Sequence, residues 1–175
     1  METPTRERIL YAAAELFRRQ GYSGTGLKQV VTEAEAPFGS LYHHFPGGKQ
    51  QLADEVIHTA GAFFQAHVST VFDEEDGDLE RVFARAAETL AATNFEDACP
   101  IATVALEVAS TDDHLRQATA EVFEAWTAAL AERMGDRDAA RGVLAALEGA
   151  FILCRASRST APMLAAGRMV TSAYA

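Results

Sequence analysis

A short polar run near the N-terminus carries side chains that seldom serve a protein core. Tyr42, His43 and His44 stand together, Ser40 comes shortly before them, and Lys49 follows a pair of glycines. Hydroxyl, imidazole and ammonium groups donate hydrogen bonds to phosphate oxygens and to the acceptor atoms of base edges. The run is therefore typical of a surface that binds a polar, anionic partner, and duplex DNA is the candidate.

The elements that position these groups are two short helices with a break between them. Apolar side chains at helical spacing predict helices over 26–34 and 38–45. Pro37 separates them, because the residue before a proline avoids the helical region. Thr25 is expected to cap the first helix, and Pro46 with two glycines ends the second. This order of helix, break and helix is typical of a helix-turn-helix.

Nearly every other segment also has helical periodicity, and no stretch alternates as a strand would. We therefore predict an all-α chain of about nine helices. Beyond the helix-turn-helix pair, the expected helices cover 4–20, 49–72, 78–93, 101–110, 112–134, 137–156 and 161–172. The domain boundary is predicted near residue 50, which gives a three-helix head over 1–50 and a larger helical domain over 51–175.

Charge is distributed unevenly along the chain. The net charge is −10, but residues 1–50 hold six Lys and Arg against five Asp and Glu, so the acidity belongs to residues 51–175. A near-neutral head permits DNA binding without requiring it. The acidic run 73–78 is predicted to be a solvated turn at a helix start, because the alternating ligands of a calcium loop are missing.

The cysteine pattern and the hydropathy bear on the compartment. Cys99 and Cys154 lie far apart and match no metal or redox spacing, so we expect two buried, reduced thiols. A disulfide is the alternative in an oxidising compartment. No apolar run approaches the length that spans a bilayer, and no signal peptide precedes the first helix. The expected location is the cytoplasm, with no membrane partner, cofactor or metal.

Residues 1–60 resemble the DNA-binding domain of the TetR family of bacterial transcriptional regulators. The resemblance rests on the order and spacing of Arg8-Ile9-Leu10, Ala12-Ala13, Leu16-Phe17, Gly21-Tyr22, Thr25, Gly39-Ser40-Leu41-Tyr42-His43-His44-Phe45 and Lys49. The extra glycine in 45–49, together with Cys99-Pro100-Ile101-Ala102, is similar to one branch that controls efflux genes and releases DNA on binding drugs or flavonoids. The family implies a homodimer, a C-terminal ligand pocket, and a third helix that enters the major groove.

Residue chemistry and the resemblance together give the candidate DNA-binding residues. Tyr42 and His43 lie on the face of the third helix away from Leu41 and Phe45, where they can reach phosphates or base edges. Lys49 stands at the start of the next helix, where free N–H groups also favour a phosphate. The complete set is Thr25, Lys28, Gly39, Ser40, Tyr42, His43, His44 and Lys49.

Alternatives stay open for the aromatic members of this set. Tyr42 can instead wedge the third helix against the first, and His44 can brace the domain rather than contact DNA. A zinc site from His43 and His44 is not expected, because neighbours on a helix point in different directions and no third ligand stands at a suitable spacing.

Three residues depart from the family pattern. Glu35 stands where a turn glycine is usual, so the turn must hold glutamate in a strained conformation or take another shape. Phe38 stands where a lysine or similar polar residue is common, and Gly26 replaces a hydroxyl residue that often meets the DNA backbone. Because phosphate contacts are lost and an anion is added, we expect modest affinity. We also expect high salt sensitivity from the phosphate contacts that remain, with each lost contact lowering the salt slope by roughly one unit.

Aromatic side chains gather in the C-terminal part. Each one by itself fits a core, but together they can line an apolar cavity for a small apolar or aromatic effector. His67, on the predicted inner stripe of helix 49–72, is a candidate polar anchor or else a core histidine. The candidate pocket residues are Phe63, His67, Cys99, Phe123, Trp126 and Phe151.

The last two predicted helices are rich in alanine and glycine, which lets helices approach closely. We expect them to form half of an isologous four-helix homodimer interface, with ordinary packing inside one chain as the alternative. A two-fold dimer predicts a near-palindromic operator. The predicted function is a DNA-binding transcriptional regulator, a repressor that a small apolar ligand releases from its operator.

Two other classes of protein compete with this function. A helical ligand-binding or scaffold protein with a decayed DNA head is motivated by Glu35, Phe38 and Gly26. An enzyme is not expected, because the sequence has no nucleophile elbow, phosphate-binding loop or metal triad.

Overall fold

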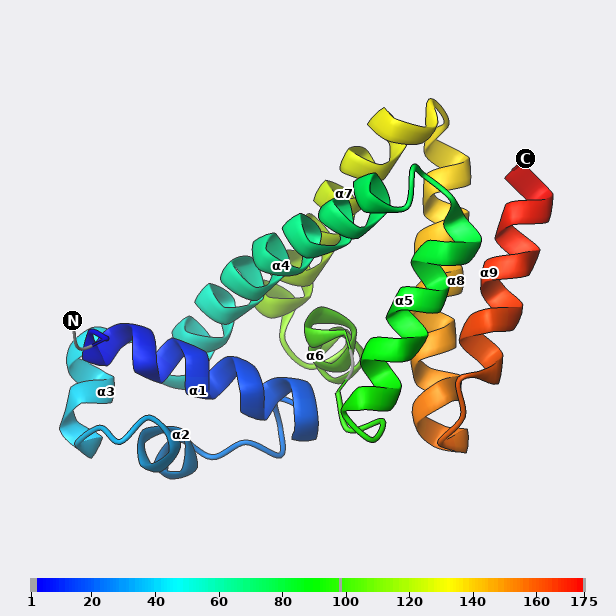
Figure 1. Cartoon of the computed structure of the whole chain (residues 1–175). Coiled ribbons are helices and arrows are strands. Elements are labelled where there is room, and N and C mark those ends of the chain that lie inside the picture. Colours follow the sequence, from blue (N-terminus) through cyan, green and yellow to red (C-terminus); the bar gives the residue numbers. More distant parts are fainter. Residues whose placement is uncertain (1–2, 98, 175) are drawn as a thin grey trace. The chain divides into compact units, whose positions relative to one another are not determined.

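The computed structural model describes residues 3–97 and 99–174, and over these residues it contains nine helices and no strand (Figure 1). The helices are α1 Thr5–Gln20, α2 Leu27–Glu33, α3 Phe38–His44, α4 Gly48–Glu74, α5 Leu79–Ala92, α6 Pro100–Val108, α7 Asp113–Met134, α8 Arg137–Ser157 and α9 Ala161–Tyr174. The predicted all-α class is confirmed, and no predicted helix end is displaced by more than two residues. Within the described residues, no helix combines the length and the apolar character needed to cross a membrane.

The chain divides into two compact units. The first contains residues 1–62 and 100–122, and the second contains residues 63–99 and 123–175. Since α4 and α7 each contribute residues to both units, the division by packing passes through these two helices. The assignment of DNA binding to 1–50 and of ligand binding to 51–175 is a division by function, and it stays a prediction.

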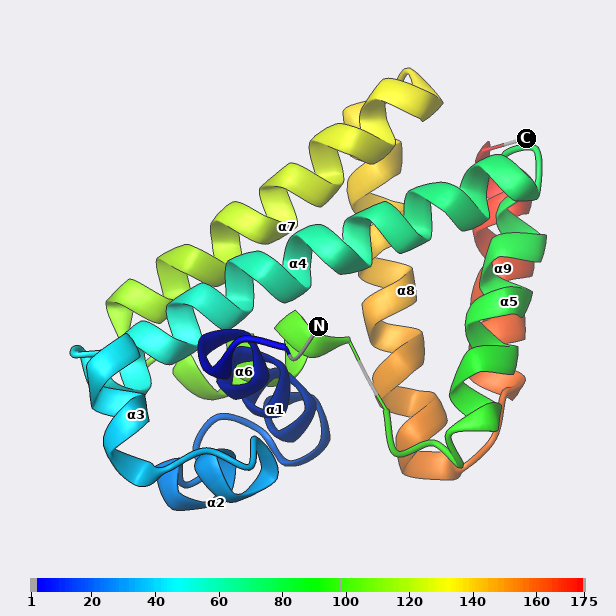
Figure 2. The ribbon, with the colours of Figure 1, turned by 60° about the vertical axis from the view of Figure 1, so that its left-hand side comes forward.

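In the first unit, α1 packs against α2, α3 and α6 (Figure 2). Ile9, Ala13 and Phe17 follow one another at helical spacing along α1 and are fully buried. Leu41 of α3 and Phe45 just after it are fully buried too. Burial of each such large side chain stabilises the fold by about 1.5–3 kcal/mol, so the three short N-terminal helices share one small core.

In the second unit, α5 and α8 both pack against α9, and Figure 1 shows the three helices as a bundle. α5 and α9 approach closely at Gly167, where an added Cβ would lie 2.8 Å from the Cβ atom of Phe83. The bundle is filled by apolar side chains, among them Leu79, Phe83, Leu90, Val143, Leu147, Cys154, Met163 and Val170. A glycine at this contact therefore lets α5 and α9 share a tightly packed core.

Acidic side chains begin two helices of the second unit. Asp78, at the end of the run 73–78, accepts a hydrogen bond from the backbone N–H of Arg81 at 3.2 Å. Asp136 accepts from two backbone N–H groups in the first turn of α8. Carboxylates in these positions satisfy free N–H groups and interact favourably with the helix dipole. The prediction of a turn leading into a helix start is confirmed for residues 75–78, whereas Asp73 and Glu74 still belong to α4.

Candidate nucleic-acid interface

The turn between α2 and α3 is held by an arginine of α1. The Nε atom of Arg8 donates to the carbonyl oxygen of Ala34 at 3.0 Å, and its Nη2 atom donates to the carbonyl oxygen of Glu35 at 3.2 Å. Glu35 has a φ of 48°, which lies in the left-handed region that disfavours residues with a Cβ atom. Of the two shapes predicted for this turn, the structure has the strained one.

α3 presents two different faces. Leu41 is fully buried, whereas Tyr42 is 50% exposed and Phe38 is 45% exposed. His43 is also exposed, while Ser40 and His44 are half-buried. Tyr42 packs edge-to-face on Phe38 with 5.9 Å between the ring centroids. The hydroxyl and imidazole donors of the predicted site are therefore accessible to a partner.

Thr25 does not cap α2. Its side chain is buried, and its hydroxyl donates to the carbonyl oxygen of Gly21 at 2.7 Å while it accepts from Gln20 at 3.2 Å. The residue that precedes α2 is Gly26, which has no side chain to cap it. The predicted capping role is wrong because the Thr25 hydroxyl closes the loop back onto the end of α1. Lys28, the second residue of α2, is exposed.

Lys49 lies on an aromatic ring at the start of α4. Its Nζ atom is 4.3 Å from the centroid of the Tyr22 ring, a cation–π contact. Partial burial lowers the pKa of the Lys49 ammonium, and the Glu107 carboxylate acts in the opposite direction. The predicted phosphate contact of Lys49 stays a prediction, and the structure adds that the ammonium is held by a partner within the protein.

Glu107 of α6 fixes the loop between α1 and α2. Its Oε2 atom accepts a hydrogen bond from the backbone N–H of Ser23 at 2.6 Å. Gly21 in the same loop has a φ of 81°, and a Cβ atom there would collide with the Glu107 carboxylate. Sequence reasoning missed this support, since no local pattern links residues so far apart in the chain.

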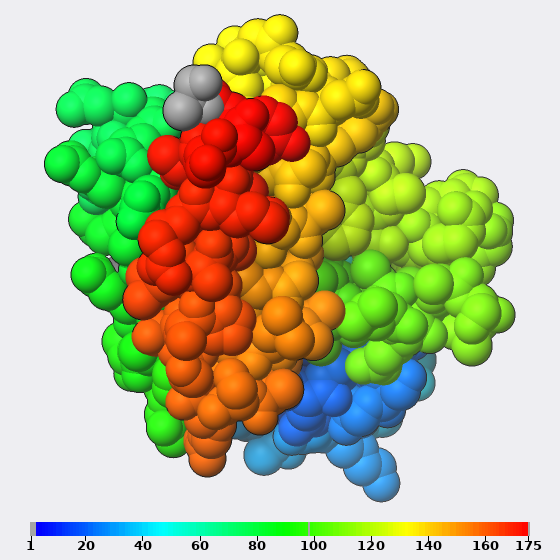
Figure 3. Space-filling view, turned by 90° about the vertical axis from the view of Figure 1, so that its right-hand side faces the viewer, coloured from blue at the N-terminus to red at the C-terminus, as the bar shows by residue number. Residues whose placement is uncertain are grey.

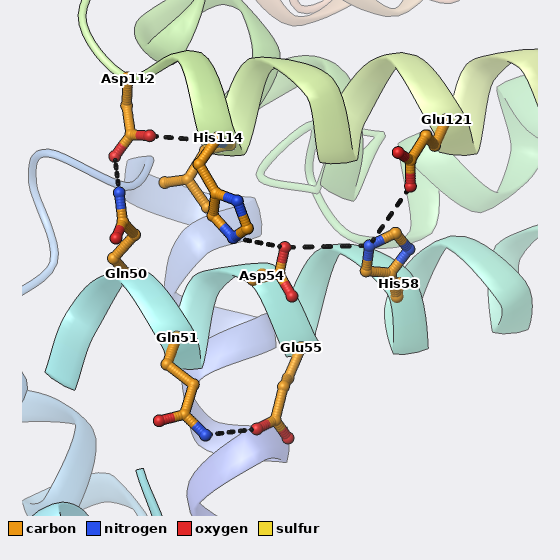
Figure 4. Close-up of polar contacts among 9 residues, drawn as sticks. Gln50, Gln51, Asp54, Glu55, His58, Asp112, His114 and Glu121 are labelled. Atoms are coloured by element: carbon orange, nitrogen blue, oxygen red, sulfur yellow. Dashed lines mark hydrogen bonds and ion pairs between the residues drawn. The ribbon is translucent and has the colours of Figure 1, made fainter. Parts of the chain in front are cut away.

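A polar network joins the first halves of α4 and α7 within the first unit (Figure 4). The amide of Gln50 donates to Asp112 Oδ2 at 2.8 Å. Asp54 Oδ1 lies 3.1 Å from His114 Nε2 and 3.9 Å from His58 Nε2. No group of three or more His, Cys, Asp and Glu side chains in the described residues is arranged to hold a metal ion. The network therefore positions α4, the helix that follows α3.

The second unit contains a small apolar cavity of about 60 Å³. Its walls come from α4, α5, α7 and α8 and include Phe64, Val68, Phe72, Phe83, Trp126, Ala129, Leu130, Val143 and Leu147. An open groove of about 490 Å³ shares Phe72, Leu79 and Arg133 with it. Arg133 pairs with Asp73 at 3.3 Å beside this groove. Because drug-sized ligands need roughly 300 Å³ or more, the cavity must widen to admit one.

The structure places only some of the predicted pocket residues at the cavity. Trp126 lines the cavity, and Phe123 packs edge-to-face on Trp126 at 5.5 Å. Phe151 packs against the core of the bundle, and Cys99 is buried away from the cavity walls. The predicted place of His67 on an inner stripe of α4 is wrong, because the structure exposes His67. Phe63, another pocket candidate of α4, is 77% exposed. Neighbouring α4 side chains line the cavity instead.

Glu148 of α8 is a half-buried residue with buried carboxyl oxygens, and sequence reasoning did not single it out. Neither of its carboxyl oxygens accepts a hydrogen bond of ordinary geometry. Burial raises the pKa of Glu148 to about 7, and the nearby Cys99 thiol acts in the opposite direction. Cys99 and Cys154 are both buried thiols that form no disulfide, as predicted. A carboxyl group that holds its proton close to neutral pH is thus part of the second unit.

Two stretches of the chain match described families. Residues 9–56 match the bacterial regulatory proteins of the tetR family, and residues 77–169 match the C-terminal domain described as transcriptional regulator LmrA/YxaF-like. The HTH-type transcriptional regulator LmrA of Bacillus subtilis (strain 168) is 32% identical over 171 residues, with 91% of each chain covered. An uncharacterized HTH-type regulator of Mycobacterium tuberculosis (strain H37Rv) is 36% identical over 174 residues, with 90% of this chain and 88% of that one covered.

Solved structures agree with the fold. The regulatory protein TetR from Rhodobacter sphaeroides superposes with a TM-score of 0.84 at 20% identity, over 98% of this chain and 99% of that one. The reduced form of Escherichia coli NemR has a TM-score of 0.80 at 21% identity, over 96% and 95% of the two chains. The chain therefore belongs to the tetR family of bacterial regulatory proteins, and it is a helix-turn-helix transcriptional regulator rather than an enzyme.

Proposed function

We propose that this regulator is a repressor that leaves a palindromic operator when a small apolar or aromatic ligand enters its second unit. The observation that carries the proposal is the division of α3 into two faces. Leu41 is sealed in the core, while Tyr42 and His43 offer a hydroxyl and an imidazole to a duplex. Regulators of this family bind DNA operators and usually dimerise, so the exposed face of α3 is the surface for that contact.

The DNA contacts follow from the positions of the side chains. Tyr42 and His43 reach base edges or phosphates from α3, with Gly39, Ser40 and His44 beside them. Lys28 adds an exposed ammonium from α2. Lys49 offers a charge at the start of α4. Thr25 contributes by closing the α1–α2 loop, because its hydroxyl donates to the carbonyl oxygen of Gly21 instead of to DNA. Because the contacts are largely to phosphates, binding weakens as salt rises.

The proposed dimer forms through α8 and α9. Four large apolar side chains stay exposed on these helices, namely Ile152, Leu153, Leu164 and Met169. Figure 3 looks onto α9, with α8 and α5 on either side of it. Exposed apolar side chains together with small residues let two such helix pairs pack as a four-helix interface. A two-fold dimer then requires two half-sites in the operator.

The proposed ligand binds in the apolar cavity of the second unit. The cavity walls include Phe64 and Phe72 of α4 and Trp126 of α7. The same two helices also carry Asp54 and His114, which belong to the polar network of the first unit. A ligand that widens the cavity therefore displaces helices on which the DNA-binding unit depends. The proposal includes a drug or flavonoid as the ligand and efflux genes as the target, which is what the resemblance of Cys99-Pro100-Ile101-Ala102 and of residues 45–49 to one branch of the family implies.

A DNA-binding regulator acts where the chromosome is, so the proposed location is the cytoplasm, and the proposal includes no membrane contact. No cofactor takes part in the proposed cycle, since the effector is the only small molecule that it needs.

Fluorescence anisotropy with a labelled duplex from the DNA flanking the gene tests the DNA part. We expect a sequence-specific, salt-dependent complex that the double substitution Tyr42→Ala and His43→Ala abolishes. Tyr11→Ala is the matched control, because Tyr11 is a tyrosine of α1 that is 72% exposed, and it should bind like the unaltered protein. Absence of any sequence-specific complex at low salt would contradict the proposal.

Release is tested by adding a flavonoid to the preformed complex. We expect the anisotropy to fall to that of free DNA. Ala129→Leu, which fills the cavity from within, should bind the operator normally and resist release. Equal release of the two proteins would place the ligand elsewhere.

A further inference from the structure

Phe38 is an exposed aromatic ring on the DNA-binding helix. It is the first residue of α3, follows Pro37, and is 45% exposed. Its ring packs on that of Tyr42 at 5.9 Å with an interplanar angle of 70°. The core of the first unit does not use this ring, because the buried residue of α3 is Leu41. The exposed part of this apolar ring, at the start of α3, is therefore available to a partner outside the chain.

The position of Phe38 limits what its ring can read. In a helix-turn-helix, residues near the N-terminus of the second helix contact base edges in the major groove. A phenyl ring has no hydrogen-bond donor or acceptor for those edges. The C5-methyl group of thymine is the apolar feature that the major groove presents, and phenylalanine is among the side chains that contact it.

Gly39 gives an independent sign of a close approach at this place. Its φ is not positive, and an added Cβ atom would meet no protein atom within 4 Å. Glycine inside a helix costs about 1 kcal/mol relative to alanine, so the fold itself gains nothing from it. A base edge or phosphate that comes close to the backbone of α3 accounts for this glycine, and it brings the neighbouring Phe38 ring to the same groove.

We infer that Phe38 is a specificity-determining residue that contacts a thymine methyl group, so that each operator half-site has one A·T pair whose thymine faces the first turn of α3. Tyr42 holds the Phe38 ring in place through the edge-to-face contact. This inference rests on the proposed operator binding, and it adds which base the helix selects.

The test uses deoxyuridine, which differs from thymidine at the base only by the missing methyl group. An operator is first selected from random duplexes with the full-length protein, and each thymine is then replaced by uracil, one symmetric pair at a time. At one position per half-site we expect the affinity to fall about 4-fold for each lost methyl contact. For a dimer with both half-sites altered, the two losses combine to about 15-fold.

Two variants identify the reader of that methyl group. Phe38→Ala should bind the thymine operator more weakly and should no longer distinguish thymine from uracil at that position. Phe38→Leu, which keeps an apolar side chain, should retain part of the distinction. Tyr11→Ala, with a comparably exposed aromatic residue on α1, should keep all of it. Circular dichroism confirms that each variant is folded, which the exposure of Phe38 favours.

The outcomes separate the inference from the proposed function. If the protein selects an operator but no thymine-to-uracil change weakens it, the inference is overturned while operator binding stands. The same holds if Phe38→Ala still loses affinity on that change, because another residue then contacts the methyl group. If no duplex is selected at all, both the inference and the proposed function fall.

Discussion

The guanidinium group of Arg8 donates to the main-chain carbonyl of Glu35 at 3.2 Å, so a side chain of α1 holds the strained residue of the helix-turn-helix turn. The contact links the longest helix of the DNA-binding head to the segment that sets the angle of α3. Strain in the turn and the contact that opposes it can be altered separately.

Relief of the strain at Glu35 should stabilise the protein. Glu35→Gly places a residue that tolerates a φ of 48° in the turn, and we expect about 0.5–1 kcal/mol of added stability after the greater chain entropy of glycine is counted. Urea unfolding measures the change. Glu35→Gln is the control, because it removes the charge and keeps the strain, so it should leave stability nearly unchanged. Equal stabilisation by both variants would assign the effect to charge.

Loss of the Arg8 contacts should destabilise the protein. Arg8→Leu leaves the carbonyl groups of Ala34 and Glu35 without their side-chain donor, and we expect a loss of about 1–2 kcal/mol with weaker operator binding. Arg8→Lys keeps the charge but cannot donate from two nitrogens in the same geometry, so it should recover only part of the lost stability and operator binding. Urea unfolding and fluorescence anisotropy on the same samples measure stability and operator binding. Full recovery of both by Arg8→Lys would contradict the explanation from donor geometry.

The α1–α2 loop should not tolerate a side chain at Gly21. Gly21→Ala needs a φ of 81° and meets the Glu107 carboxylate, so we expect a loss of about 2 kcal/mol or more. Adding Glu107→Ala should restore part of the lost stability, since the collision disappears while the backbone strain remains. The matched control is Gly26→Ala, where φ is −93° and an added Cβ has open space. A large loss at Gly26 in thermal unfolding would contradict this reading.

Glu148 should make the stability of the protein depend on pH. The folded state holds the Glu148 proton up to about pH 7, whereas the unfolded chain releases it near its ordinary pKa of 4.5. The folded state therefore binds more protons between these values, and stability should fall as pH rises from 4.5 to 7. The full effect is about 3 kcal/mol.

Glu148→Gln removes the titrating group and should remove this component of the slope. The measurement is urea unfolding of both proteins across that pH range, and the informative quantity is the difference between the two curves. Parallel curves would show that the Glu148 carboxyl titrates alike in the folded and unfolded states.

Local patterns predicted the helices and the accessible face of α3. Leu41 and Phe45 are four residues apart, so they fix which side of that short helix is buried and leave Tyr42 and His43 on the other side. Over such a short helix, one apolar pair is enough to set the phase.

The same reasoning failed along α4, a helix of 27 residues. Phe63 and Phe64 are neighbours that point about 100° apart, and composition does not reveal which of them faces inward. The structure exposes Phe63 and lines the cavity with Phe64. The supports from Glu107 and the α4–α7 network were not predictable either, because they join residues that the fold alone brings together.

The position of Lys49 on the Tyr22 ring bears on how much entropy its side chain loses when the head binds a polyanion. A free lysine loses roughly 1.5–2 kcal/mol of rotamer entropy when it is immobilised. Here much of that ordering is complete once the chain has folded, and the ring offsets the positive charge without neutralising it. The protein thus carries a preorganised cation at the start of α4, where our proposed phosphate contact would form with little further ordering of the side chain.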